Sequence, residues 1–256
     1  MLAAERVVLI TGAAHGIGRA LARLLVPSAR LALVDLEGDA VSALAAELGG
    51  QARALPLQVD VTDRPQVEGM VARTLGAFGR LDALVNCAGG MSGLAHPHRR
   101  ALETLSPEEW DATFALNVKS VFLCAGAAAP ALRAAGGGRI VSVASSAARM
   151  GSTTAGPAYV ASKAAVIGLT RCLANLLAPE GILVNAVAPG ATESERFLAA
   201  MAERTPEERA RSASRVPLGR HARPEEVAAT IAFLLSDGAG YITGATIDVN
   251  GGVFGV

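Results

Sequence analysis

Short runs of apolar residues alternate along this chain with longer stretches in which apolar residues recur at helical spacing. Runs that are apolar throughout, such as VVLI at 7–10 and LALV at 31–34, are typical of parallel strands covered on both faces. Strands are expected at 6–10, 30–35, 54–60, 81–86, 139–144, 183–188 and 246–249, and helices at 16–25, 39–48, 65–78 and within 125–138. This alternation predicts βαβ crossovers and an α/β fold with a doubly wound parallel sheet.

Composition narrows the class of protein. No linker, repeat or charge block divides the chain, so residues 1–256 are expected to form a single domain. The 23 basic side chains balance 23 acidic ones, which argues against a nucleic-acid partner. The three cysteines form no CxxC pair, no secretory signal opens the chain, and no charge-free apolar stretch approaches about 20 residues. We therefore expect a cytoplasmic protein that does not bind membranes.

A glycine-rich loop follows the first expected strand. Gly12, Gly16 and Gly18 have the spacing GxxxGxG, and such glycines let the backbone approach a pyrophosphate at the N-terminus of the next helix. Asp35 ends the second expected strand, where a carboxylate accepts hydrogen bonds from an adenosine ribose and repels a 2′-phosphate. The loop and Asp35 together predict NAD rather than NADP, although a strand-end aspartate can also cap the following helix.

Two further groups of polar residues are candidates for chemistry. Asp60 and Asn86 end the third and fourth expected strands, at the sheet edge where ligands bind in open α/β folds, although each alone more often has a structural role. Tyr159 and Lys163 lie four positions apart on an expected helix, so the phenol and the ammonium project from one face. A fixed cation would lower the phenol pKa from about 10. Out of context, the pair is more often an ordinary exposed helix face.

The motifs of this chain occur in an order that is typical of a known protein family. The motifs are TGAAHGIG at 11–18, Asp35, Asp60-Val61, NCAG at 86–89, Asn117, Ser145, YVASK at 159–163, Pro189-Gly190, RPEEV at 223–227, YITG at 241–244 and NGG at 250–252. Over essentially its whole length the chain resembles the classical short-chain dehydrogenase/reductase family. The resemblance implies a Rossmann-type sheet flanked by helices on both faces and an enzyme that acts on the CH–OH group of its donor.

The resemblance also implies residue roles. Tyr159 would be the general acid and base on the substrate oxygen, and Lys163 would lower its pKa and hold the nicotinamide ribose. Ser145 would hydrogen-bond the substrate oxygen, and Asn117 would hold a water in a proton relay. Pro189-Gly190 would pack against the nicotinamide, whose own chemistry is hydride transfer.

A larger set of residues is implied around the cofactor, and no metal is expected. The cofactor set comprises Gly12, His15, Gly16, Ile17, Gly18, Asp35, Leu36, Asp60, Val61, Asn86, Ala88, Gly89, Tyr159, Lys163, Pro189, Gly190, Thr192 and Ser194. The sequence departs from the family pattern at Cys87, which replaces an asparagine, and at Ser194, which replaces a threonine. A second serine, Ser146, adjoins Ser145.

Two segments are expected to set specificity, because they vary within the family. Residues 90–105 carry His96, His98, Arg99 and Arg100, which are either a solvated loop or donors for an anionic substrate. Residues 191–216 are expected to form a lid over the substrate. The resemblance further implies a homotetramer, and the Ala-rich stretches 112–132 and 161–177 suit subunit interfaces or burial within one subunit.

We therefore expect an NAD(H)-dependent oxidoreductase that transfers a hydride between nicotinamide and a secondary alcohol or ketone, with a small molecule as substrate. The alternative is an NADPH-dependent 3-oxoacyl-thioester reductase, against which Asp35 argues. A non-catalytic dinucleotide-binding sensor or scaffold belongs to another class, and the joint presence of Asn117, Ser145, Tyr159 and Lys163 argues against it.

Overall fold

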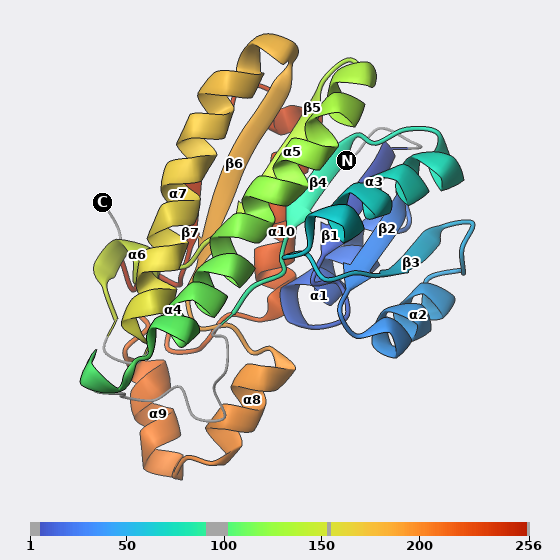
Figure 1. Ribbon diagram of the computed structural model, residues 1–256. Helices are drawn as coiled ribbons and strands as arrows, with labels where there is room; N and C mark the ends of the chain where they lie inside the picture. Colours follow the sequence, from blue (N-terminus) through green and yellow to red (C-terminus); the bar gives the residue numbers. More distant parts are fainter. Residues whose placement is uncertain (1–5, 91–101, 153–154, 255–256) are drawn as a thin grey trace.

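The computed structural model describes residues 6–90, 102–152 and 155–254, and these residues build one parallel sheet (Figure 1). Its strands are β1 (Arg6–Thr11), β2 (Ala29–Asp35), β3 (Ala54–Gln58), β4 (Ala83–Asn86), β5 (Gly138–Val143), β6 (Ile182–Pro189) and β7 (Thr246–Val249). Their order is β3-β2-β1-β4-β5-β6-β7, and every neighbouring pair is parallel. The chain reverses its direction of travel across the sheet between β1 and β4, which is the point where open α/β sheets bind ligands. The doubly wound α/β fold is thereby confirmed.

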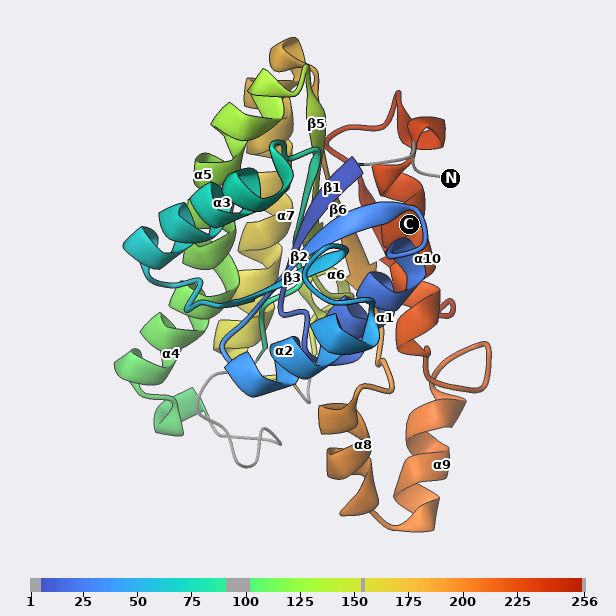
Figure 2. The same cartoon turned by 90° about the vertical axis from the view of Figure 1, so that its right-hand side faces the viewer.

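Helices cover both faces of this sheet (Figure 2). The helices are α1 (Gly16–Leu25), α2 (Gly38–Glu47), α3 (Arg64–Phe78), α4 (Pro107–Phe114), α5 (Ser120–Ala134), α6 (Ala147–Met150), α7 (Pro157–Leu177), α8 (Glu195–Ala202), α9 (Pro206–Ser214) and α10 (Pro224–Leu235). Helices α3, α5 and α7 lie on one face, and α1 and α10 lie on the other. Helices α8 and α9 project below the sheet, within the segment expected to form a lid.

The first strand shows how one apolar run serves two layers. Val8 and Ile10 belong to the core packed under α1 and α10, whereas Val7 and Leu9 belong to the core under α3 and α5. Because successive side chains of a strand point to opposite faces, a strand buried on both sides has to be apolar throughout. The sequence pattern thus predicts this double burial directly.

Local signals determine where several elements begin and end. Asp63 caps α3 by accepting a hydrogen bond from the Gln66 amide at 3.1 Å, and Gly79 ends the helix with a positive φ of 75°. The third strand is shorter than expected, because β3 stops at Gln58 and residues 59–63 turn into the α3 cap. Helix α9 begins at Pro206, within the expected lid segment, and Thr205 and Glu208 form its capping box.

Two helical stretches are long and apolar enough to cross a membrane by length and composition, namely Pro107–Ala134 and Pro157–Glu180. Both stretches contain charged residues, among them Lys119 and Lys163, so they differ from a charge-free apolar stretch of about 20 residues. The finding is weak evidence for a membrane protein, because core helices of water-soluble proteins pass the same test. Here α5 and α7 pack against β4, β5 and β6.

Candidate active site

The loop between β1 and α1 is held tightly against the end of β4. A Cβ on Gly12 would lie 2.7 Å from the Ala88 amide nitrogen, and Gly12 itself has a positive φ of 64°. A Cβ on Gly18 would overlap the Gly12 carbonyl oxygen. The hydroxyl of Thr11 accepts a hydrogen bond from the Ala88 amide at 3.2 Å. The glycines therefore make a compact turn whose backbone is open to a ligand at the start of α1.

Replacing Gly18 by alanine is expected to destabilise the protein by about 1–3 kcal/mol, because a backbone carbonyl cannot move away as a flexible side chain can. The measurement is the thermal midpoint, which should fall by about 2–4 °C per kcal/mol for a chain of this size. Gly76→Ala is the matched control, since a Cβ there meets nothing within 4 Å in α3 and should stabilise by about 0.5–1 kcal/mol. Equal midpoints for the two variants would contradict the tight turn.

Asp35 lies at the end of β2 beside this loop. One carboxylate oxygen accepts a hydrogen bond from the Ala14 amide at 3.0 Å, and the other accepts one from the Glu37 amide at 3.2 Å. The Asp35 side chain thus fixes the loop from the side where an adenosine ribose is expected. His15 lies next to it and contacts the Glu37 carboxylate at 3.1 Å, whereas the Leu36 side chain is exposed.

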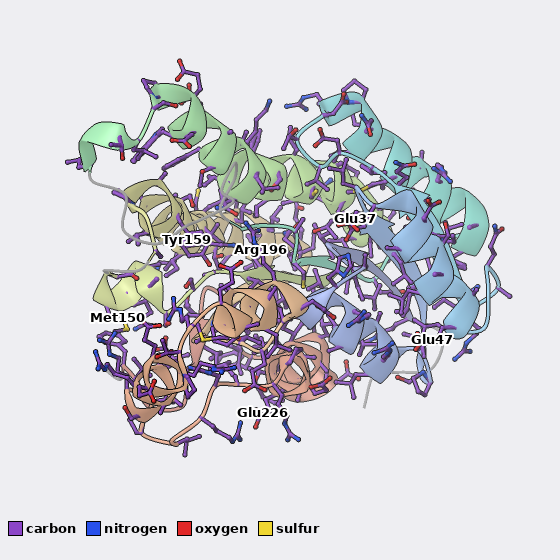
Figure 3. All side chains as sticks on the ribbon, turned by 90° about the horizontal axis from the view of Figure 1, so that it is seen from below. Glu37, Glu47, Met150, Tyr159, Arg196 and Glu226 are labelled. Atoms are coloured by element: carbon purple, nitrogen blue, oxygen red, sulfur yellow. The ribbon has the colours of Figure 1, made fainter. Side chains whose placement is uncertain are left out.

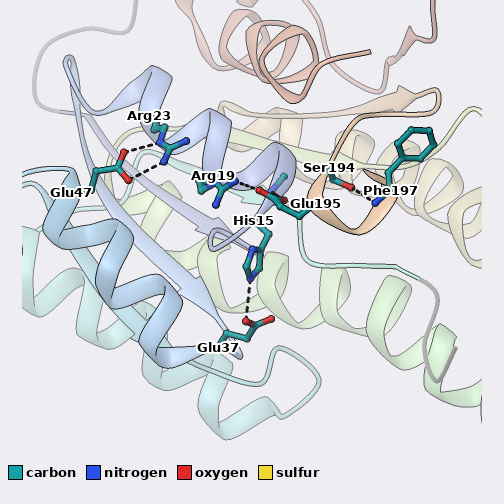
Figure 4. Close-up of polar contacts among 9 residues, drawn as sticks. His15, Arg19, Arg23, Glu37, Glu47, Ser194, Glu195 and Phe197 are labelled. Carbon is teal, nitrogen blue, oxygen red and sulfur yellow. Dashed lines mark hydrogen bonds and ion pairs between the residues drawn. The ribbon is translucent and has the colours of Figure 1, made fainter. Parts of the chain in front are cut away.

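A residue that sequence reasoning missed occupies the N-terminus of α1. The Glu195 carboxylate, from the start of α8, accepts a hydrogen bond from the Gly16 amide at 3.1 Å and pairs with Arg19 (Figure 4). A Cβ on Gly16 would lie 3.1 Å from the Ser194 Cβ, so the lid segment contacts the loop closely. A helix N-terminus attracts anions, and a pyrophosphate is expected to bind at this same position. The negative charge of Glu195 in ESERF is the only signal that could have indicated it.

Tyr159 and Ser145 face one another at the carboxyl end of the sheet. Tyr159 lies in the first turn of α7, and buried Ser145 follows the end of β5. Burial raises the pKa of the Tyr159 phenol, while a hydrogen bond with Ser145 and the positive charge of Arg196 act in the opposite direction. Of the two adjacent serines, Ser145 is therefore the one in contact with Tyr159. The phenol is protonated at neutral pH.

Lys163 lies one helical turn beyond Tyr159 and is buried. Its ammonium donates a hydrogen bond to the Val143 carbonyl at 2.7 Å and lies 6.0 Å from the centre of the Tyr159 ring. Burial lowers the pKa of Lys163 to about 8. Burial also raises the pKa of the Cys87 thiol to about 12, so this cysteine is a neutral neighbour of the ammonium. The lowering of the Tyr159 pKa by Lys163, which the family resemblance implies, stays a prediction.

Asn117 completes the group from a third element. It lies fully buried in a π-helical turn, η2 (Ala115–Lys119), between α4 and α5, and such turns are frequent at functional sites. Its amide accepts from the Gly90 nitrogen at 2.8 Å and donates to the Gly90 carbonyl at 2.8 Å and to Ser162 at 3.0 Å. A Cβ on Gly89 would lie 2.9 Å from the Asn117 Oδ1 and 3.0 Å from the Lys163 Nζ. The Gly89 backbone therefore lies close to the polar ends of both side chains.

The remaining residues predicted from the sequence also lie at this edge, mostly in contact with backbone. Asp60 accepts hydrogen bonds from the Thr62 amide at 2.8 Å and hydroxyl at 2.7 Å, and Asn86 donates to Ser142 at 3.1 Å. Pro189 ends β6, Gly190 adjoins the Asn250 backbone, and the Thr192 hydroxyl donates to the Gly190 carbonyl at 3.0 Å. The Ser194 hydroxyl caps α8 at the Phe197 amide, 3.3 Å away.

The structure gives less information on the remaining residues named from the sequence. His96, His98, Arg99 and Arg100 lie outside the described residues. Among the residues that the structure does describe, no three His, Cys, Asp or Glu side chains gather as a metal site. Ile17 packs against the core under α1 and α10. Val61 belongs to the core under α3 and α5, and Ala88 packs against that core.

Comparison with known proteins identifies the family to which this chain belongs. The family model described as enoyl-(acyl carrier protein) reductase matches residues 12–254. A cis-4-hydroxycyclohexanecarboxylate dehydrogenase from Sinomonas cyclohexanicum is 40% identical over 250 residues, covering 97% of this chain and 96% of that protein. The crystal structure of a short-chain type dehydrogenase/reductase from Mycobacterium marinum superposes with a TM-score of 0.89 at 34% identity, covering 98% of this chain and 96% of that one.

A second solved structure is also similar. It is a 3-ketoacyl-(acyl-carrier-protein) reductase from Brucella melitensis complexed with NADH, with a TM-score of 0.85 at 32% identity, covering 97% of this chain and 98% of that one. The matches extend over nearly the whole chain, and the motifs and the sheet order agree with them. The chain belongs to the short-chain dehydrogenase/reductase family, whose members bind a nicotinamide dinucleotide, and it is an oxidoreductase that acts on CH–OH groups.

Proposed function

We propose that this protein is an NAD(H)-dependent dehydrogenase that transfers a hydride between nicotinamide and a secondary alcohol or its ketone. The observation that carries the proposal is the convergence of three elements on one point. The Tyr159 and Ser145 hydroxyls meet there, and Lys163 and Asn117 lie directly behind them. This point and the glycine-rich loop lie at the same edge of the sheet, on opposite sides of the switch between β1 and β4.

The loop fits a dinucleotide. Gly12 and Gly18 leave no room for a Cβ, so the backbone between them can approach a pyrophosphate at the N-terminus of α1. Asp35 lies beside this loop, bonded to the Ala14 amide, which supports its proposed role as acceptor for the adenosine ribose and as a charge that disfavours a 2′-phosphate. Pro189, Gly190 and Thr192 continue the same edge from β6 toward the position proposed for the nicotinamide.

Under this proposal, each of the four polar residues has its own role in the reaction. The nicotinamide, when bound, accepts or supplies the hydride. Tyr159, whose pKa is raised by burial, holds its proton at neutral pH and donates it to the substrate oxygen when a ketone is reduced. Ser145 orients that oxygen through its hydroxyl. Asn117 holds the Gly90 backbone in place, and Lys163 is held by the Val143 carbonyl. Together they supply a polar route behind the phenol along which the proton is replaced.

The experiment that tests this function is a cofactor-coupled screen of purified enzyme. Secondary alcohols, hydroxy acids and a 3-oxoacyl thioester are each assayed with NAD(H) and NADP(H), with absorbance at the nicotinamide band as readout. We expect turnover of at least one secondary alcohol with a preference for NAD. Thioester reduction with NADPH alone would favour the alternative reductase. Dinucleotide binding without any turnover would indicate a sensor.

The lid has a specific role in cofactor binding under this proposal. Glu195 carries its carboxylate to the Gly16 amide, where the pyrophosphate is proposed to bind, so the two anions compete. Removing the charge with Glu195→Gln is expected to tighten NAD binding about threefold to tenfold. The size of the effect follows from the two interactions that the carboxylate loses, one with the helix N-terminus and one with Arg19 in an exposed ion pair. Calorimetric titration of NAD measures this change.

Glu203→Gln is the matched control for that experiment, because Glu203 is an exposed carboxylate at the other end of α8. Its NAD affinity should equal that of the wild type. Weaker NAD binding by Glu195→Gln would mean that the carboxylate holds the lid over the cofactor and does not compete with it.

We further propose a single domain over residues 1–256 with a lid at 191–216, assembled as a cytoplasmic homotetramer. Exposed aromatic side chains at Trp110 and Phe122, on the continuous helix that contains α4 and α5, support an interface there. Light scattering after size-exclusion chromatography measures the subunit number.

A further inference from the structure

Arg196 brings a positive charge from the lid to the catalytic residues. It is the second residue of α8, and its side chain crosses from the lid toward the sheet edge, next to Tyr159 (Figure 3). Its Nη1 lies 3.0 Å from the position that a Cβ on Gly90 would take. Gly90 is the residue whose backbone is bonded on both sides by Asn117. The guanidinium therefore lies beside the group formed by Tyr159, Ser145, Lys163 and Asn117.

The two neighbouring carboxylates of the lid have other partners. Glu195 interacts with the Gly16 amide and with Arg19, on the cofactor side of α8. The charge of Glu193 acts on Arg220, beyond the opposite side of the segment. The charge of Arg196 acts on Tyr159, where it favours the phenolate. The three charged side chains of residues 193–196 are thus directed to different places, and the positive one is directed toward Tyr159.

We propose that Arg196 is a specificity-determining residue that binds a carboxylate of the substrate, so that the preferred substrates are hydroxy acids and the corresponding keto acids. This inference rests on the proposed dehydrogenase function, because it takes Tyr159 and Ser145 as the position of the reacting oxygen. A substrate anchored there and extending toward Gly90 reaches the guanidinium of Arg196, a planar group whose N–H geometry matches a carboxylate.

The surroundings favour one negative charge over two. Glu193 and Glu195 both precede Arg196 in the chain and are directed elsewhere, so a dianion such as a phosphate monoester would find one guanidinium for its two charges. A carboxylate carries one charge and needs only one such partner. Because the anchor belongs to the lid, binding the carboxylate also draws α8 toward the reacting centre and helps to exclude water.

The test compares each hydroxy acid with its own methyl ester, which replaces the negative charge at the proposed anchor by a neutral group that is one methyl larger. The pairs are 3-hydroxybutyrate and cis-4-hydroxycyclohexanecarboxylate with their methyl esters, and the readout is the acid-to-ester ratio of kcat/KM. The wild type should prefer the acids. Arg196→Met should lower that ratio about 10- to 100-fold, mainly through KM of the acids, because a hydrogen-bonded charge pair is lost. Arg196→Lys should recover part of it.

Arg209→Met is the matched control, since Arg209 is exposed on α9 of the same lid, and its ratio should equal that of the wild type. A wild-type preference for the esters, or an unchanged ratio in Arg196→Met, would overturn the inference while the dehydrogenase function stands. Calorimetric titration of cyclohexanecarboxylate into the enzyme with NAD gives a second readout independent of turnover. Binding that Arg196→Met loses supports the anchor even if no alcohol is oxidised, and absence of binding to the wild type overturns it.

Discussion

Tyr159→Phe is expected to lower kcat by about 10²- to 10⁴-fold, the range that general acid–base catalysis contributes. The change removes one hydroxyl and leaves the ring, so the contact between the ring and the Lys163 side chain remains. What disappears is the protonated phenol that donates to the substrate oxygen and its hydrogen bond with Ser145. Steady-state kinetics on the best alcohol of the screen, in both reaction directions, measures the effect.

The chain contains a natural control for this variant. Tyr241, its second tyrosine, is fully exposed, and Tyr241→Phe should have wild-type kcat. The NAD dissociation constant of Tyr159→Phe, measured by calorimetry, should equal that of the wild type, which separates a lost proton donor from a damaged cofactor site. Wild-type turnover by Tyr159→Phe would remove this residue from the mechanism.

Asp35→Ala is expected to narrow the preference for NAD over NADP by about 10- to 100-fold. The substitution removes the repulsion of a 2′-phosphate and also the hydrogen bonds from the ribose, each of which is worth a factor of about ten or more when a charged group takes part. The readout is the ratio of kcat/KM for the two cofactors with a saturating alcohol. An unchanged ratio would remove Asp35 from the ribose site.

Two further variants separate charge from loop structure. Asp35 also accepts hydrogen bonds from the Ala14 and Glu37 amides, so Asp35→Ala loosens the loop as well. Asp35→Asn keeps an acceptor there and removes the charge, and it should shift the cofactor ratio with less loss of stability. Asp111→Asn, an exposed and remote carboxylate on α4, should leave the ratio as in the wild type.

Much of the fold follows from local patterns. Strands apolar throughout have to be buried on both faces, and the turn and capping signals between them are short-range, so the expected elements agree with the observed ones to within a few residues. The largest difference is at α5, which begins at Ser120 and ends at Ala134, whereas a helix is expected within 125–138. A smaller difference is at β3, where the cap of α3 forms a turn from residues expected to be in the strand. The π-helical turn at Asn117 was not predicted, because one extra residue in a helical turn leaves no mark in apolar periodicity.

The sequence by itself determined the α/β class, the glycine-rich loop, the position of Asp35 at a strand end and the motif order that indicates the family. These depend on residue type and short spacing, which remain the same whatever the packing. Only the tertiary structure decided that Glu195 reaches the Gly16 amide, that Ser145 is the serine in contact with Tyr159, and that burial raises the pKa of this phenol. It also decided that Arg196 lies beside Gly90. Each of these depends on contacts between segments far apart in the chain and on the desolvation that packing imposes, and neither has a local sequence signal.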